Sequence, residues 1–276
     1  MTHCRSDVWL EVGDRVFSRR YAFLDQQIGA ILTDDGPVVV DTRTTARQAH
    51  EIGDDLRALT TLPVAAVVDT HHHWDHSFGN GAFRPAPIWG HRRCAARLRR
   101  DGPARRQAAI DELPEMADEL RETVVVPPDR TFEDAVTFEI GGRPIELRYE
   151  GLGHTDNDIV VLVADAEVVF AGDLVENNAP PNFDDGYPLD WPTTLGRVRT
   201  LVHGVVVPGH GDVGKVDFVD RTIAEIGLIA DLARQVDAGG RSLADAVAAA
   251  PYPAAAARRA LERGLAQVRG ELHVEP

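Results

Sequence analysis

The sequence predicts an α+β protein in which helices face two β-sheets. Short apolar runs with the character of strands come in two consecutive sets, one within residues 8–91 and one within residues 131–171. Segments of helical character lie between the two sets and after the second. A sheet must bury its apolar face against another layer, so this order of elements favours two sheets covered by helices. With 276 residues, 43% of them hydrophobic, the chain is long enough for one large domain.

The first half of the chain alternates strands with one helix before it reaches a polar loop. Residues 44–59 predict the helix, because Ile52, Leu56 and Leu59 fall on one face. Residues 64–69 read as a buried strand that ends at the loop. The other expected strands of this half cover residues 8–12, 15–18, 21–24, 27–33, 37–41 and 86–91.

Residues 92–122 predict a helical insertion, broken near Gly102-Pro103 and again near Pro114 because proline interrupts helices. Its first half is rich in arginine, although the protein as a whole is acidic. The arginines are Arg92, Arg93, Arg97, Arg99, Arg100, Arg105 and Arg106. Two interpretations stay open. A charge run usually forms a solvated helix face with acidic partners, but the insertion is also placed to form a lid or a subunit contact over a site.

The second half predicts two hairpins, a long loop and a helical end. The hairpins cover residues 131–140 with 144–150, and residues 158–164 with 167–171. The loop at residues 174–190 is rich in Asn, Pro, Asp and Gly, and loops of this length inside a compact domain are often functional. Helices are expected at residues 192–202, 216–236, 242–249 and 253–268, with a strand at 204–207. We treat residues 1–276 as one domain with its core at about 8–229 and a helical C-terminal extension at 230–276.

The charge balance limits the classes of partner. The chain has 29 basic and 44 acidic residues, a net charge of −15. Such acidity argues against nucleic acid or an anionic membrane as a partner. Residues 1–7 lack the apolar segment of a signal peptide, and the two cysteines, Cys4 and Cys94, are too few for a disulfide framework. We therefore expect a cytoplasmic protein that acts on a small molecule, with self-association left open.

The stretch THHHWDH at residues 70–76 follows the strand at 64–69 directly and concentrates metal-ligating side chains. In an extended segment, His71 and His73 point the same way and reach one ion. If the chain then turns into a helix, Asp75 and His76 reach a second point nearby. Imidazole and carboxylate suit Zn²⁺, and also iron or manganese.

These residues resemble the signature of the metallo-β-lactamase superfamily, and THHHWDH is similar to the glyoxalase II branch. Three further segments match the family's downstream motifs in order: Gly151-Leu152-Gly153-His154-Thr155, Phe170-Ala171-Gly172-Asp173 and Pro208-Gly209-His210-Gly211. The early strand that ends at Asp41 matches as well. The resemblance implies a four-layer αβ/βα sandwich, with two mixed sheets inside, helices on the outer faces and metals at one edge between the sheets.

The resemblance also implies roles for individual residues. It assigns His71, His73 and His154 to one metal and Asp75, His76 and His210 to a second, with Asp173 bridging both. Two Zn²⁺ ions are the expected cofactor, and a hydroxide between them would attack the substrate. Asp75 is the first candidate for the proton shuttle. Tyr187, in the long loop, is the second. Asp41, Asp69, Thr155 and Asp158 are candidates to orient the ligand histidines.

The fold alone does not fix the reaction. Asp173 stands where several true β-lactamase classes carry cysteine or serine, which lowers the expectation of β-lactam hydrolysis. The C-terminal part lacks the glutathione-binding pattern of glyoxalase II. We therefore expect a dinuclear zinc hydrolase of a small ester, lactone, thioester or amide, with lactonase-like chemistry preferred. The main alternative is a persulfide dioxygenase-like enzyme with one iron, held by His71, His154 and Asp173. β-Lactam hydrolysis is the second alternative.

Overall fold

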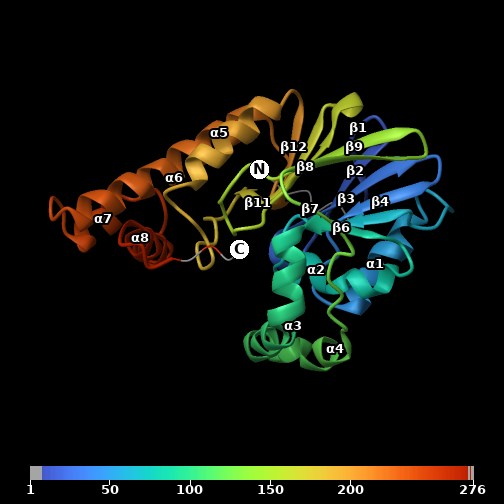
Figure 1. Cartoon of the computed structure of the whole chain (residues 1–276), viewed down its shortest axis with the longest axis horizontal. Coiled ribbons are helices and arrows are strands. Elements are labelled where there is room, and N and C mark those ends of the chain that lie inside the picture. Colours follow the sequence, from blue (N-terminus) through green and yellow to red (C-terminus); the bar gives the residue numbers. More distant parts are fainter. Residues whose placement is uncertain (1–7, 273, 275–276) are drawn as a thin grey trace.

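The twelve described strands are hydrogen-bonded in one continuous arrangement that divides into two packed sheets, one from each half of the chain (Figure 1). The computed structural model describes residues 8–272 and residue 274, so Cys4 and the expected absence of a signal peptide at residues 1–7 lie outside the described residues. The first sheet has the order β1 to β7, and its strands are β1 (Leu10–Gly13), β2 (Val16–Tyr21), β3 (Gln26–Thr33), β4 (Gly36–Val40), β5 (Ala66–Val68), β6 (Ile88–His91) and β7 (Arg130–Phe132). The second sheet has the order β8 to β12, and its strands are β8 (Ala135–Ile140), β9 (Arg143–Arg148), β10 (Val160–Val163), β11 (Val168–Glu176) and β12 (Val205–His210). The two sheets join where His210 of β12 pairs with Gln26 of β3.

Helices cover the outer faces of both sheets (Figure 1). The longer helices are α1 (Ala46–Leu56), α3 (Arg92–Glu112), α5 (Trp191–Leu201), α6 (Val216–Asp237), α7 (Leu243–Ala249) and α8 (Ala254–Val268). The short helices are α2 (Trp74–Ser77) and α4 (Ala117–Glu122), and single 3-10 turns lie at Phe23–Asp25, Phe78–Phe83, Pro114–Met116 and Ala164–Ala166. None of the helices in the described part of the chain is both long enough and apolar enough to cross a membrane.

Three apolar clusters define four layers. The central cluster joins the inner faces of the two sheets, with Ile31 and Val68 from the first sheet against Leu147 and Phe170 from the second. A second cluster packs α1 on the first sheet, and a third packs α5, α6 and α8 on the second sheet. Helices therefore lie outside both sheets and the sheets face each other, which confirms the predicted αβ/βα sandwich.

Two predicted element boundaries are wrong. The strand predicted at residues 21–24 does not form, because β2 ends at Tyr21 and Leu24 and Asp25 adopt left-handed backbone angles (φ 57° and 58°) in the 3-10 turn. The strand predicted at residues 167–171 continues to Glu176, because β11 pairs in parallel with β12 up to the partners Glu176 and His210.

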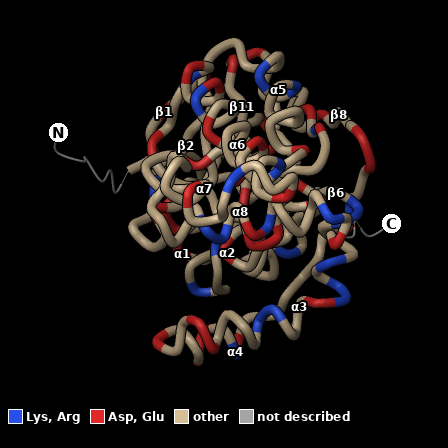
Figure 2. The backbone as a smooth tube through the Cα atoms, turned by 90° about the vertical axis from the view of Figure 1, so that its left-hand side faces the viewer, with Lys and Arg blue, Asp and Glu red and all other residues tan. Residues whose placement is uncertain are grey.

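The insertion also differs from its prediction at one of two prolines. Helix α3 runs without interruption through Gly102 and Pro103, whereas the predicted break at Pro114 is confirmed by the 3-10 turn that separates α3 from α4. Leu98 and Ala109, on either side of Pro103, pack in one buried cluster with Phe78. This shared packing holds both halves of the helix in line despite the proline. Figure 2 shows α4 at one end of the molecule, with acidic and basic residues mixed along α3 and α4.

Candidate metal centre

Four segments bring seven histidine and aspartate side chains to the edge where the two sheets meet. His71, His73, Asp75 and His76 follow β5 and run into α2. His154 lies in the loop before β10, Asp173 lies within β11, and His210 ends β12. Carboxyl ends of parallel strands meet at one sheet edge, which is why distant motifs converge here.

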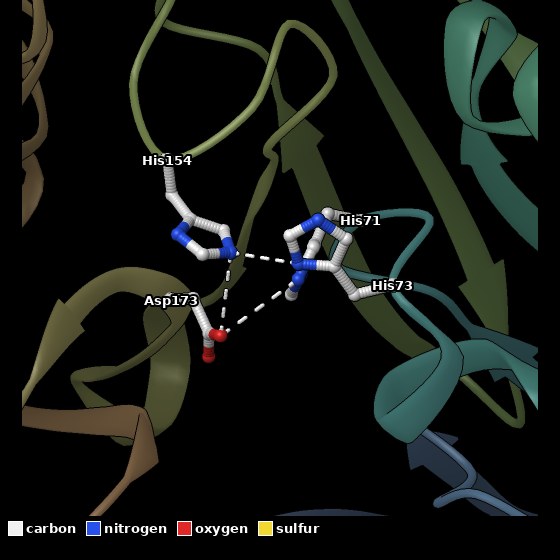
Figure 3. A group of neighbouring side chains, drawn as sticks. All are labelled: His71, His73, His154 and Asp173. Carbon is white, nitrogen blue, oxygen red and sulfur yellow. Dashed lines mark hydrogen bonds and ion pairs between the residues drawn. The ribbon is translucent and has the colours of Figure 1, made fainter. Parts of the chain in front are cut away.

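The first group consists of His71, His73, His154 and Asp173, whose ligand atoms lie within 4.8 Å of one another (Figure 3). His154 Nε2 is 2.8 Å from His73 Nδ1 and 3.5 Å from Asp173 Oδ2. His71 Nε2 lies 3.8 Å from the same Oδ2 atom. The three imidazoles therefore surround one carboxylate oxygen.

The second group consists of Asp75, His76 and His210. The Nε2 atoms of His76 and His210 each lie 3.3 Å from Asp75 Oδ2. They also lie 3.3 Å and 3.4 Å from the other oxygen of Asp173, Oδ1. Asp173 thus presents one oxygen to each group, which is the geometry that a bridging carboxylate requires. Gly209 makes room for it, because a Cβ at that position would overlap Asp173 Oδ1.

The donor set fits divalent metal ions. Imidazole nitrogens and carboxylate oxygens are typical zinc ligands. His71 Nε2 and Asp173 Oδ1 are buried without a hydrogen-bond partner among the described residues, and such atoms need a partner to offset their desolvation. Burial lowers the pKa values of His71, His73 and His154, so these rings are neutral, as metal ligation requires.

The comparisons with known proteins agree with this geometry. Residues 23–210 match the family model of the Metallo-beta-lactamase superfamily. The chain belongs to this superfamily. A Metallo-beta-lactamase type 2 of Bacteroides fragilis is 26% identical over 219 residues, which are 77% of this chain and 82% of that protein. A Linear primary-alkylsulfatase of a Pseudomonas strain is 25% identical over 64% of this chain and 40% of its own length.

The fold comparison covers the same region. A metallo-beta-lactamase from Pontibacter korlensis superposes with a TM-score of 0.66 at 22% identity, over 79% of this chain and 98% of that one. Family membership and the histidine and aspartate groups together support a metal-dependent hydrolase.

Behind the ligands of this superfamily member lie contacts that orient the rings. Asp41 is buried and its Oδ2 lies 2.8 Å from His76 Nδ1, which confirms that it buttresses the site. The same carboxylate accepts hydrogen bonds from the backbone N–H and hydroxyl of Thr70, and this hydroxyl lies 3.1 Å from His71 Nδ1. The Leu24 carbonyl lies 2.8 Å from His210 Nδ1. Asp41 therefore serves both groups.

The other three candidates for orienting residues do not contact a ligand ring directly. Asp69 Oδ2 accepts a hydrogen bond from Asn80, 2.8 Å away. Thr155 donates its hydroxyl and its backbone N–H to the Asp158 carboxylate, which shapes the loop that carries His154. Their contacts with the candidate ligands are therefore indirect.

A cavity of about 410 Å³ is lined by five of the seven residues, namely His73, Asp75, His154, Asp173 and His210. Asp75 lines it, as expected of a proton shuttle, whereas Tyr187 does not. Tyr187 is buried and lines a neighbouring cavity with His72 and Arg97, so the structure gives no support to it as a catalytic residue. The seven predicted ligands are brought together, and their binding of metal stays a prediction.

Three pocket residues were missed from the sequence. Glu176 lines the cavity, and burial together with the nearby Asp173 raises the pKa of Glu176 to about 8. Asp185 contacts His73, and Arg105 of the insertion contacts Asp185. The position of Asp185 in the long loop after Asp173 was a usable signal, but no local pattern marked Arg105 among seven arginines.

Proposed function

We propose that the protein is a dinuclear zinc hydrolase that cleaves a small ester, lactone, thioester or amide. The observation that carries this proposal is the arrangement of Asp173, whose two oxygens face two separate groups of histidine ligands. A pair of zinc ions bound there supplies Lewis acidity and a water molecule of lowered pKa. The remaining work falls to the side chains of the chain itself.

In this proposal His71, His73 and His154 hold one ion, and Asp75, His76 and His210 hold the other. In the metal-free protein, burial opposes ionisation of Asp75, but His76 and His210 outweigh it and hold the pKa of Asp75 well below its ordinary value. The ionised carboxylate lines the cavity, so it is placed to accept a proton from the attacking water and to pass it to the leaving group. Asp75 therefore has two proposed roles.

The proposal is tested by substrate panels on zinc-loaded protein. Esters, lactones, thioesters and amides form the main arms, and metal-free protein is the control. An alkyl sulfate joins the panel because one relative is named Linear primary-alkylsulfatase. Turnover of a carbonyl substrate that disappears without metal supports the proposal. Full activity in the metal-free protein contradicts it.

β-Lactam hydrolysis is a second candidate, supported by the relatives named Metallo-beta-lactamase type 2. Asp173 argues against β-lactam hydrolysis, because it stands where several true β-lactamase classes carry cysteine or serine. A β-lactam arm in the same panel decides between the two. The one-iron dioxygenase alternative needs His71, His154 and Asp173, and the structure brings these three residues together as well. Metal analysis therefore decides between one iron and two zinc ions. The net charge of −15 supports a small-molecule substrate over nucleic acid.

A further inference from the structure

Three nitrogen-bearing side chains contact the same carboxylate oxygen of Asp185. Asp185 lies in the loop between β11 and α5, and its side chain is 38% exposed. Its Oδ2 atom is 3.1 Å from His73 Nε2, 3.1 Å from Arg105 Nη2 and 3.5 Å from His72 Nε2. One oxygen therefore joins the motif after β5 to the arginine-rich insertion.

The contact with His73 decides which ring nitrogen is available. A neutral imidazole carries one proton, and the hydrogen bond made by one nitrogen sets the role of the other. A carboxylate beside Nε2 places the proton there. The lone pair is then left on Nδ1, which faces His154 and the first group (Figure 3).

Arg105 holds this carboxylate in position. The guanidinium belongs to α3, which is fixed on both sides of Arg105 because Leu98 and Ala109 are buried against Phe78. The Arg105 side chain is only 24% exposed, so it is also fixed by burial. Without it, a carboxylate with more than a third of its surface in solvent is free to turn away from His73.

We propose that Asp185, anchored by Arg105, is a positioning residue that fixes His73 with Nδ1 towards the first group. The insertion thereby sets the metal affinity of that group. This inference rests on the proposed metal site. A different occupant, a third metal ion between His72, His73 and Asp185, is disfavoured because the Arg105 cation already lies against the same oxygen.

The test combines metal affinity with the tautomer of His73. Asp185→Ala, Asp185→Asn and Arg105→Gln are compared with two matched controls. Arg100→Gln removes the same charge from the same helix, where the guanidinium pairs with Asp101 and is 49% exposed. Asp184→Ala removes an exposed carboxylate from the same loop, one residue away. Zinc affinity is measured by chelator competition, and ¹⁵N NMR of the metal-free protein reports which nitrogen of His73 is protonated.

Asp185→Ala should lower the affinity of the first group by about 10–100-fold, the usual effect of losing such an outer contact. It should also shift the His73 proton away from Nε2. Asp185→Asn keeps an acceptor oxygen and should retain the tautomer with a smaller loss of affinity. Arg105→Gln should fall between wild type and Asp185→Ala, and both controls should match wild type.

An unchanged His73 tautomer and unchanged zinc affinity in Asp185→Ala overturn the inference. So does a third equivalent of zinc that is lost in this variant, because Asp185 would then be a ligand. The NMR measurement needs no metal. It therefore decides the role of Asp185 even if the two-metal proposal fails, and a wild-type protein that binds fewer than two ions counts against that proposal alone.

Discussion

The two halves of the candidate metal centre differ in what lies behind their predicted ligands. In the second group, His76 is oriented by Asp41 at the end of β4, and His210 by the Leu24 carbonyl next to β3. Both partners belong to the first sheet and its connections. In the first group, His73 is oriented by Asp185, and the Asn182 carbonyl lies 3.0 Å from His154 Nδ1. Both of these partners belong to the loop between β11 and α5.

The difference is clearest between His76, which contacts the buried Asp41, and His73, which contacts the partly exposed Asp185. Asp41, behind His76, is buried, whereas Asn182 is exposed and Asp185 is half-buried; Leu24, behind His210, is itself 42% exposed in the 3-10 turn before β3. Changes in the loop or in α3 should therefore alter the first group without unfolding the sheets. His71 is the exception in the first group, because Thr70 links it to Asp41. We expect the two halves to respond unequally to most substitutions.

Asp173→Ala should have the largest effect, because the two oxygens of this carboxylate face the two groups. Zinc affinity should fall at both groups by more than the roughly 100-fold that losing an outer contact can cost. Hydrolysis should fall with it. Chelator competition resolves the two binding steps. Loss at one group with the other intact would show that Asp173 does not bridge.

Asp41→Ala should act on both groups but more strongly on the second. It touches His76 directly and reaches His71 through Thr70. Affinity at the second group should fall about 10–100-fold. The buried N–H of Thr70 loses its acceptor, which should lower the free energy of unfolding of the metal-free protein by about 1–3 kcal/mol. Equal losses of zinc affinity at both groups would contradict the expected difference between them. Asp41→Asn, which keeps the volume of the side chain, is the control.

The two halves should also differ in their response to pH. Burial opposes protonation of His76 and His210, but Asp173 and Asp75 outweigh it and raise both pKa values well above normal. We therefore expect these rings to bind protons more readily than ordinary histidines in the metal-free protein, and a metal must displace any proton bound at the ligating nitrogen. Affinity at the second group should fall about tenfold per pH unit for each proton displaced, as pH drops below the raised pKa values.

The first group should be nearly insensitive over the same range, because burial keeps its three histidines neutral. The same protons stabilise the metal-free fold at low pH, and this contribution is lost as pH rises through the raised pKa values. Calorimetric titration in buffers of different ionisation enthalpy counts the protons released. Equal release at both groups would contradict the assignment.

Asp69→Asn should have the smallest effect on metal binding. Asp69 follows β5 as Asp41 follows β4, but the Asp69 carboxylate contacts Asn80 and no predicted ligand ring. Burial raises the pKa of Asp69 well above its ordinary value, so the wild-type fold loses stability as pH rises from the unfolded pKa towards the folded one. The Asp69→Asn variant should lack this dependence of stability on pH. Unfolding at several pH values should show it, with zinc affinity unchanged; an affinity loss as large as that of Asp41→Ala would give Asp69 a role that its contacts do not explain.

The resemblance to the superfamily predicted the four layers and the seven candidate ligands, because the motifs that carry it are short and local. His71 and His73 share a short motif, and His154, Asp173 and His210 lie in short segments next to strands. The continuous helix through Pro103 could not be predicted, because packing of Leu98 and Ala109 against Phe78 overrides the local effect of proline. The link from Arg105 to Asp185 joins residues 80 positions apart, and nothing in the local sequence specifies that contact.

Metal stoichiometry tests the central claim most directly. Elemental analysis of protein purified without added metal, followed by zinc titration, counts the ions held by the two groups. The account predicts two zinc ions per chain and fewer than two in Asp173→Ala. One iron per chain, with no capacity for a second ion, would contradict it.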